Sequence, residues 1–369
     1  MPFSPISEIL DDLRAGKMIV LVDDEHRENE GDLVCAAQYI SPEIVNFMTK
    51  YARGVLCVAL DGESCDRLEL TPQSAVNTAQ LRTAFTVTVD AHERFGVTTG
   101  VSASDRATTI RLLGDPNTNP ADLVRPGHIN PLRARDGGVL VRTGQTEGSV
   151  DLCRMAGLEP AAVIIEIMND DGSMARRPEL EELCKIHDLK MCSVADIVAY
   201  RMGREKLVER IEQRTIDTEF GEFELMVYQS QVDSMPHVAL CKGRVGQQVI
   251  DDDVLVRMHR QNLLGDVFGD RSQSSGDVLR ASMKRIQEQG EGAIVYLRQD
   301  FAGIGRETHG GDESGASGPK TQIGIGAQIL GDLGVQKLTL LTNHPHNSPP
   351  KALSGFGLQV TGHESASMD

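Results

Sequence analysis

The sequence predicts an α/β protein of two domains, on the evidence of three observations. Up to about residue 200, strand-like and helix-like segments alternate, a pattern typical of helices that cover a central sheet. Near residues 203–212 the pattern changes to a charged stretch followed by two β-like runs around Gly221. The 369 residues are enough for two hydrophobic cores. We therefore expect a layered α/β (α+β) domain with a mixed central sheet at residues 1–205 and a second α/β domain at residues 206–369.

The elements of the first domain follow from apolar periodicity and capping residues. The expected strands are residues 17–22, 54–60, 84–90, 137–142, 161–168 and 190–194. The expected helices are residues 41–52, 102–114, 146–157, 177–189 and 195–203. Ser41 followed by Pro42 is a helix start, and Gly114 and Gly157 are helix ends. A further helix near the N-terminus has Ser4 as its expected cap.

The second domain combines strands and helices in a different order. A hairpin around Gly221 is followed by a helix at 276–290, a strand at 293–299, a helix at 323–334 and a strand at 337–343. Residues 307–321 are rich in Gly and Ser and lack periodicity, which predicts a mobile loop.

Composition excludes several classes of function. A formal net charge of -17 argues against nucleic-acid binding, which needs basic patches. No apolar run approaches the ~20 residues that span a bilayer, and the N-terminus has acids where a signal peptide has a basic end. The seven cysteines form no CxxC pair, which indicates reduced thiols. We expect a cytoplasmic protein that binds neither nucleic acid nor membranes.

The stretch DDEHRENEGD, residues 23–32, carries six acidic residues around one arginine. Carboxylate oxygens suit a hard cation such as Mg²⁺, which takes only one or two of them, so Glu28 alone would suffice. Arg27 could grip a phosphate or hydroxyl with its planar guanidinium. Taken alone, the stretch favours a solvated, charged turn over a metal site.

Three other positions suggest acid–base chemistry or anion binding. His128 is expected on a rigid Pro-Gly turn between Arg125 and Arg133, where an acid/base group facing an anion competes with a structural histidine. Glu166 lies within an otherwise apolar strand, so it is either a buried group suited to general acid–base work or a residue at an exposed edge. The helix start at Thr146 is either a phosphate site or an ordinary N-cap.

Four stretches together resemble 3,4-dihydroxy-2-butanone 4-phosphate synthase, an enzyme of riboflavin biosynthesis. They are residues 23–32, 85–111, 125–152 and 166–176, and the resemblance extends over residues 5–202. It implies a lyase that converts D-ribulose 5-phosphate to L-3,4-dihydroxy-2-butanone 4-phosphate and formate. It also implies Mg²⁺ as cofactor, with Mn²⁺ as the alternative, and a homodimer with sites near the subunit interface.

The resemblance assigns roles by position. His128 and Glu166 are implied as the catalytic residues, and Glu28 as a metal ligand. The residues implied for substrate binding are Arg27, Glu28, Asp32, Arg142, Thr143, Gly144, Gln145, Thr146 and Glu166. The family usually has histidine as second metal ligand where this chain has Gln145. Direct ligation by its amide oxygen, ligation through a water and no metal role are all open; the matching neighbours favour a retained site.

Four stretches of the second half, residues 256–270, 296–305, 323–345 and 355–360, follow one another in the order found in another family. Through them the chain resembles GTP cyclohydrolase II over residues 212–362. That family holds zinc with three cysteines, which correspond here to Asn262, Gln273 and Ser275. Because none of these is a thiolate, we expect no zinc and a cyclohydrolase-like domain without catalytic activity. Two alternatives remain: a bifunctional enzyme that also acts on GTP, and a non-catalytic regulator that binds pentose phosphate or a nucleotide.

Overall fold

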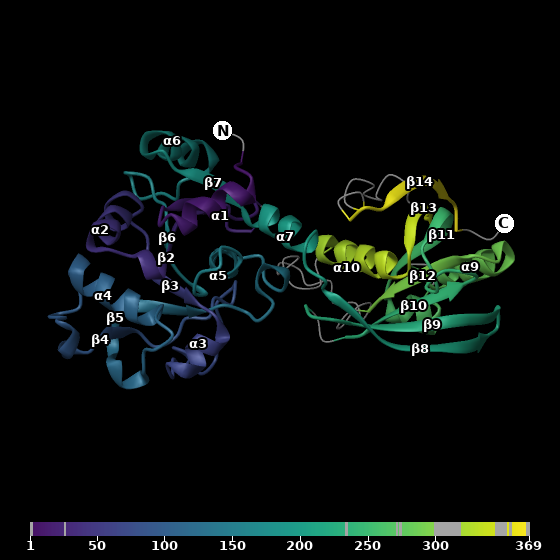
Figure 1. The fold of residues 1–369 in the computed structure, drawn as a ribbon, viewed down its shortest axis with the longest axis horizontal. Helices are drawn as coiled ribbons and strands as arrows, with labels where there is room; N and C mark the ends of the chain where they lie inside the picture. Colours follow the sequence, from purple (N-terminus) through teal and green to yellow (C-terminus); the bar gives the residue numbers. More distant parts are fainter. Residues whose placement is uncertain are drawn as a thin grey trace. The chain divides into compact units, whose positions relative to one another are not determined.

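The chain divides into two compact units, Met1–Tyr200 and Arg201–Asp369 (Figure 1). The computed structural model describes residues 3–25, 27–232, 235–270, 272, 275–298, 319–343, 353 and 356–366. Within these residues each unit contains one seven-stranded sheet. The division falls a few residues before position 206, where the second domain was expected to begin.

The first sheet is mixed, as the sequence predicts. Its strands, in spatial order, are β4 (Val89–Ala91), β5 (Leu123–Arg133), β3 (Cys57–Leu60), β6 (Ala161–Glu166), β2 (Gly31–Ala36), β1 (Ile19–Val22) and β7 (Lys190–Ser193). The β3–β5 and β1–β7 pairs are parallel, and the other pairs are antiparallel. Strands β1, β2 and β3 are buried along their whole length, because helices cover both faces of the sheet.

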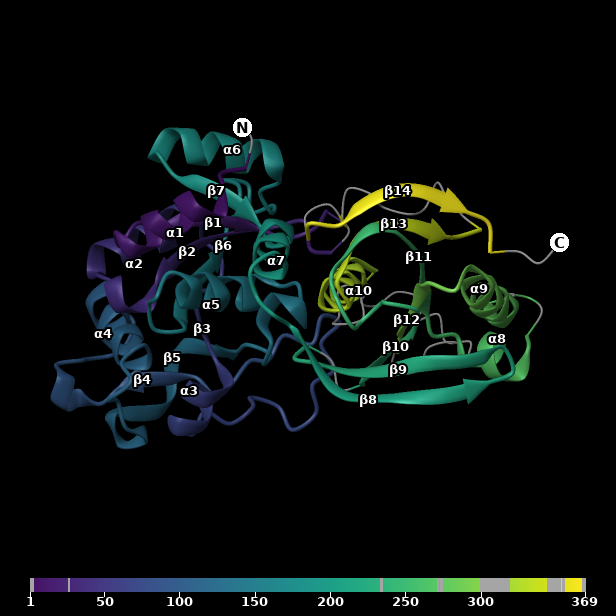
Figure 2. The same ribbon diagram turned by 45° about the vertical axis from the view of Figure 1, so that its right-hand side comes forward.

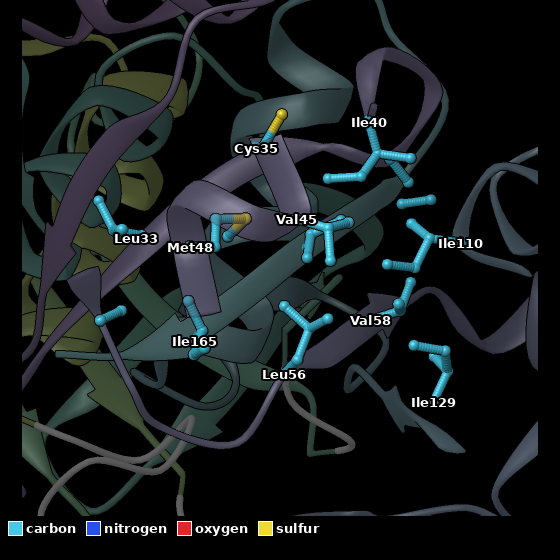
Figure 3. Close-up of a cluster of buried hydrophobic side chains, with 14 of the residues drawn as sticks. Leu33, Cys35, Ile40, Val45, Met48, Leu56, Val58, Ile110, Ile129 and Ile165 are labelled. Atoms are coloured by element: carbon cyan, nitrogen blue, oxygen red, sulfur yellow. The ribbon is translucent and has the colours of Figure 1, made fainter. Parts of the chain in front are cut away.

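Helices cover the two faces of this sheet in separate layers. The helices of the first unit are α1 (Ile6–Arg14), α2 (Pro42–Tyr51), α3 (Gly62–Arg67), α4 (Ala103–Leu113), α5 (Gln145–Met155), α6 (Arg177–His187) and α7 (Val194–Met202), with short 3-10 turns at η1 (Ala37–Tyr39), η2 (Glu93–Phe95), η3 (Pro120–Asp122) and η4 (Gly138–Leu140). On one face, Val45 and Met48 of α2 and Ile110 of α4 pack over the strands (Figure 3). On the other face, α5 packs closely against β1. The backbone of Gly148 lies so near this strand that an added Cβ would be 2.9 Å from the side chain of Leu21.

Several local predictions were wrong in the first unit. The expected strand at 137–142 is the 3-10 turn η4, because the N–H of Val139 donates to the buried carboxylate of Asp151 on α5 instead of joining the sheet. The expected strand at 84–90 is reduced to the three residues of β4. The N-cap of α1 is Pro5, not Ser4.

The second unit is built on its own sheet and core. The spatial order is β14 (Gln359–Glu364), β13 (Val335–Leu341), β11 (Ile250–Arg260), β12 (Gly292–Leu297), β10 (His237–Lys242), β9 (Gly221–Ser230) and β8 (Val208–Thr218). The expected hairpin is present, and Gly221 has a φ of 100° at its turn. The part of the expected loop at 307–318 lies outside the described residues.

Among the described residues, the longer helices of the second unit are α8 (Leu263–Phe268), α9 (Ser275–Gln289) and α10 (Pro319–Asp332). Ile286 of α9 packs with Leu255 and Ile294 of the sheet. Gly326 of α10 lies instead against the side chains of Met258 and Leu297. Since neighbouring strand residues point to opposite faces, α9 and α10 cover opposite sides of β11 and β12 (Figure 2).

Two further observations bear on the predicted class of protein. All seven cysteines are free and buried, and burial raises the pKa of the Cys35 thiol to about 12. This fits the expectation of reduced, unreactive thiols. None of the helices in the described residues combines the length and the apolar character that a bilayer crossing needs.

Candidate active site

A row of polar residues crosses the face of the first sheet that α5 covers. Asp32 on β2 is directly opposite Glu166 on β6. On the other side of β6, Cys57 of β3 pairs with both Ile164 and Asn130 of β5. His128 lies two residues before Asn130, and Glu166 lies two residues after Ile164.

The register therefore places His128 and Glu166 level with each other, two strands apart, or about 10 Å between backbones. Side chains alternate along a strand. The neighbours Leu33, Ile129 and Ile165 point into the α2–α4 core, so Asp32, Glu166 and His128 share the opposite face. His128 is thus part of strand β5, and the expectation of a turn at this position was wrong.

Glu166 is held by the backbone that precedes β3. Its Oε2 accepts a hydrogen bond of 2.8 Å from the N–H of Val55. A Cβ at Gly54 would lie 2.5 Å from the same Oε2 and 2.5 Å from the Glu166 carbonyl oxygen. Glu166 is half-buried at the strand end. Its environment is therefore intermediate between the buried position and the exposed edge that were the two alternatives.

Arg27 joins the acidic stretch to the start of α5. Its Nη1 donates to Oδ2 of Asp23 at 2.8 Å, to Oε2 of Glu28 at 2.7 Å and to Oε1 of Gln145 at 3.1 Å. Burial works to lower the pKa of Arg27, but attraction from Glu28 and Asp23 outweighs it, and the pKa lies above its ordinary value. The two expected metal ligands, Glu28 and Gln145, thus meet at one nitrogen atom.

Hydrogen bonds hold the backbone of the acidic stretch, although Asp24 and Glu25 are exposed to solvent. Asp23 has a fully buried side chain, and it accepts hydrogen bonds from the N–H groups of Glu28 and Glu30. From the other side, Arg176 donates to the carbonyl oxygens of Glu28 and Asn29. These contacts fix the backbone from which Arg27 and Glu28 project.

Asp32 is the buried carboxyl group of the row. Its Oδ1 is buried and has no hydrogen-bond partner. Complete burial, together with repulsion from Glu166 and Glu28, raises the pKa of Asp32 well above its ordinary value of 3.8. A neutral carboxylic acid at this position can donate a hydrogen bond to a ligand, which an ionised one cannot.

His128 is oriented by a residue that the sequence did not reveal. Asp90 at β4 accepts a bond from the backbone N–H of His128 at 3.0 Å, and its Oδ2 lies 2.7 Å from Nδ1 of the ring. A proton on Nδ1 would leave Nε2 as the acceptor, and about half of the His128 side-chain surface is exposed. The loop before α4 also packs against the His128 ring. Gly100 in this loop has no room for a side chain, since an added Cβ would be 2.7 Å from Nδ1 of His128.

The segment before α5 is fixed by a buried ion pair. Arg142 donates to Oε2 of Glu147 at 2.6 Å, and the other oxygen of Glu147 accepts from the N–H of Arg135. The N-cap of α5 is Gly144, so the helix begins at Gln145 and not at Thr146. Arg142 holds this segment in place, and no feature of the sequence pointed to Glu147 as its partner.

The donor set at Arg27 fits a hard cation with few protein ligands. Glu28 supplies a carboxylate oxygen and Gln145 an amide oxygen, both of which Mg²⁺ accepts. Within the described ranges, no group of three or more His, Cys, Asp or Glu side chains could enclose a metal ion. Mg²⁺ usually keeps waters or substrate oxygens in most of its positions, so two protein oxygens are compatible with it.

In the second unit, the positions of the expected zinc cysteines belong to a hydrogen-bond network around Asp266. Ser275 donates to Asp266 at 2.7 Å, Tyr296 at 2.8 Å and the N–H of Asn262 at 2.9 Å, while His259 lies at 3.0 Å. Burial works to raise the pKa of Asp266, but these hydrogen bonds outweigh it and hold the pKa below its usual range. Gln273 lies outside the described residues.

Comparison with known proteins identifies relatives of both units. The family profile of 3,4-dihydroxy-2-butanone 4-phosphate synthase matches residues 7–200, and that of GTP cyclohydrolase II matches residues 209–365. A riboflavin biosynthesis protein RibBA from Aquifex aeolicus is 44% identical over 374 residues, covering 97% of this chain and 91% of that protein. A RibBA protein from Synechocystis is 45% identical, and this chain spans 66% of its length.

Solved structures are similar either to the whole chain or to its first unit. RibBX from A. baumannii, described as a two domain 3,4-dihydroxy-2-butanone 4-phosphate synthase, has a TM-score of 0.82 and 40% identity, covering 98% of this chain and 100% of its own. A 3,4-dihydroxy-2-butanone 4-phosphate synthase in complex with two magnesium ions has a TM-score of 0.53 and 38% identity, covering 55% of this chain and 98% of its own.

Proposed function

The chain belongs to the 3,4-dihydroxy-2-butanone 4-phosphate synthase family of riboflavin biosynthesis, and we propose that its first unit carries out the family reaction at the row formed by Asp32, Glu166 and His128. The reaction converts D-ribulose 5-phosphate to L-3,4-dihydroxy-2-butanone 4-phosphate and formate. The observation that carries this proposal is the shared row and face of the three side chains, next to the Arg27–Glu28–Gln145 contact.

His128 is suited to remove the proton from the carbon next to the ketone. Asp90 opposite Nδ1 orients the ring and stabilises the charge that the ring gains. Glu166, held by the N–H of Val55, is the second acid–base group. A neutral Asp32 would donate a hydrogen bond to a substrate oxygen, and this bond strengthens as the oxygen gains negative charge.

The start of α5 is suited to bind the phosphate of the substrate. The N–H groups in the first turn of a helix have no partner within it and attract anions. Gln145 and Thr146 occupy this turn, and the Arg142–Glu147 pair, with Thr143 and Gly144 between them, keeps its backbone in place. Arg27 is the nearest cationic side chain on the acidic loop.

Glu28 and Gln145 would hold the divalent cation of the family. The similar structure with two magnesium ions supports Mg²⁺ as that cation, with Mn²⁺ as the alternative because Gln145 replaces a histidine. When bound, the ion would stabilise negative charge on the enediolate oxygens. The residues of the chain provide the remaining steps: they orient the substrate and move its protons.

Formate release from D-ribulose 5-phosphate tests the proposal. The full-length protein with Mg²⁺ should release formate, and a chelator should abolish the release. Glu28→Ala, His128→Ala and Glu166→Ala should each lower kcat/KM by about 10²-fold or more. Wild type without activity would contradict the function, whereas fully active variants would contradict only the assignment of the site.

For the second unit we propose that it holds no zinc and does not act on GTP. Asp266, satisfied by Ser275, Tyr296 and the N–H of Asn262, supports a structural network at the zinc position. The competing candidate is a bifunctional enzyme, because the RibBA relatives match both units of the chain. Zinc content and formate release from GTP separate the two: stoichiometric zinc with turnover would overturn our proposal.

We also propose a cytoplasmic homodimer, as the family resemblance implies. Light scattering should give twice the 40.1 kDa mass of one chain. A mass of 40.1 kDa at working concentration would contradict this assignment.

A further inference from the structure

One nitrogen atom of Arg27 contacts both candidate ligands of the divalent cation. Nη1 lies 2.7 Å from Oε2 of Glu28 and 3.1 Å from Oε1 of Gln145. The Arg27 side chain is only 7% exposed, so this contact has little water around it. The positive charge of the guanidinium is therefore located between the two oxygens.

A metal ion bound to the same two oxygens would need this position. Mg²⁺ lies about 2.1 Å from its oxygen ligands, so a guanidinium nitrogen within hydrogen-bond distance of both oxygens leaves it no room. Two cations at such short range also repel each other strongly where water is scarce. Bound metal and the present position of Arg27 exclude each other.

We propose that Arg27 is an exchangeable internal cation: the entering divalent ion displaces its guanidinium from Glu28 and Gln145, and the displaced guanidinium then binds the anionic substrate. This inference rests on the proposed function, because it takes Glu28 and Gln145 as ligands.

The loop that carries Arg27 and Glu28 has backbone hydrogen bonds that do not depend on the Arg27 guanidinium. Asp23 binds the N–H groups of Glu28 and Glu30 as well as Arg27. Arg176 binds the carbonyl oxygen of Glu28 from outside. Both sets of bonds hold the backbone of the loop without the guanidinium, so the side chain of Arg27 can leave while Glu28 stays in position.

The exchange predicts positive coupling between metal and substrate. An anion that binds the displaced guanidinium favours the metal-bound arrangement, and by linkage the metal favours the anion to the same extent. Such couplings amount to about 5-fold to 150-fold in affinity. Without the arginine this part of the coupling disappears.

Binding of Mn²⁺, followed by the loss of the free-ion EPR signal, tests the exchange without turnover. In the full-length protein, Arg27→Gln should bind Mn²⁺ about tenfold more tightly than wild type, because no cation has to be displaced. Arg176→Gln is the control for the loss of positive charge alone: its guanidinium donates to the backbone oxygens of Glu28 and Asn29 and not to either candidate ligand, so this variant should bind Mn²⁺ no more tightly than wild type. Unchanged or weaker Mn²⁺ binding by Arg27→Gln, or an equal gain in Arg176→Gln, would overturn the proposal.

Ribose 5-phosphate, an aldose that lacks the ketone, probes the coupling. It should tighten Mn²⁺ binding by about fivefold or more in wild type, and much less in Arg27→Gln. Equal tightening in both proteins would contradict the exchange. If Arg27→Gln does not fold, a Mg²⁺ titration of ¹⁵N-labelled wild type still decides: the Arg27 Nε–H signal should shift and exchange faster with water, and an unmoved signal rejects the proposal.

The outcome is distinguishable from a failure of the proposed function. Formate released by wild type together with unchanged Mn²⁺ binding in Arg27→Gln would reject the exchange and retain the function.

Discussion

Asp32 shows at the scale of one residue how this site differs from an ordinary sheet. A buried carboxyl with an unpartnered oxygen, opposite a second carboxylate on the next strand, destabilises the fold when it ionises. Its pKa is raised, so the folded protein holds the proton more tightly than the unfolded chain does. The penalty is therefore absent below the ordinary value of 3.8 and grows as the pH rises through the raised value.

Asp32→Asn should accordingly be more stable than wild type at neutral pH in the presence of a chelator. The difference in melting temperature should shrink as the pH falls toward about 4. Thermal unfolding across this range measures it, and formate assays should show a loss of activity in the same variant. A wild type that is the more stable protein at neutral pH would contradict the burial argument.

Gly54 is a second position where one residue controls the site. The added methyl group of Gly54→Ala would meet Oε2 and the carbonyl oxygen of Glu166 at 2.5 Å, and the backbone oxygen cannot move away freely. We expect a loss of about 1–3 kcal/mol of stability and reduced activity. Gly331→Ala, which has open space around it, is the control and should be neutral or stabilising. Equal effects of the two changes would refute the steric explanation.

At the scale of elements, periodicity and capping predicted the helices better than the strands. Residues 41–52 and 102–114 were correctly predicted because Ser41 and Ser102 cap α2 and α4 locally. The failure at 137–142 has a tertiary cause, since Asp151 captures the segment from another element. Local sequence carries no information about such a distant partner.

The residues of the candidate site also fall into two groups: those predicted from the sequence and those that only the structure revealed. His128 and Glu166 were identified because a family motif surrounds each of them, and their convergence on one face follows only from the strand register. Asp90 and Glu147 were missed because their roles depend on contacts that no spacing encodes. Asp90 lies within residues 85–111, one of the stretches that resemble the family, and this was the one available signal.

Glu147 offers a test of the segment that leads into α5. Its carboxylate is 1% exposed and pairs with Arg142, which is 12% exposed. Removing one charge of a buried pair leaves the other without compensation, so Glu147→Gln should cost about 3 kcal/mol. Calorimetry of the full chain should show the loss, together with weaker substrate binding. Unchanged stability would indicate that solvent reaches Arg142.

At the scale of the whole molecule, the chain is two units with separate sheets and separate cores. We propose that each unit responds to ligands by itself. The first contains the row that we propose as catalytic, whereas the second has hydrogen bonds around Asp266 at the position where the cyclohydrolase family holds a metal.

Calorimetry with ligands tests this independence. Mg²⁺ together with ribose 5-phosphate should raise the melting temperature of one transition, that of the first unit, because ligands stabilise the state they bind. Zinc or GTP should leave the second transition where it is. A zinc-dependent rise in the second transition would contradict the proposed loss of the metal site.

A crystal structure of the protein with bound ribulose 5-phosphate would test most directly whether the row is the active site. We predict the phosphate at the first turn of α5 and the sugar carbons between His128 and Glu166. Substrate bound in the second unit, or on the α2–α4 face of the first sheet, would contradict the account.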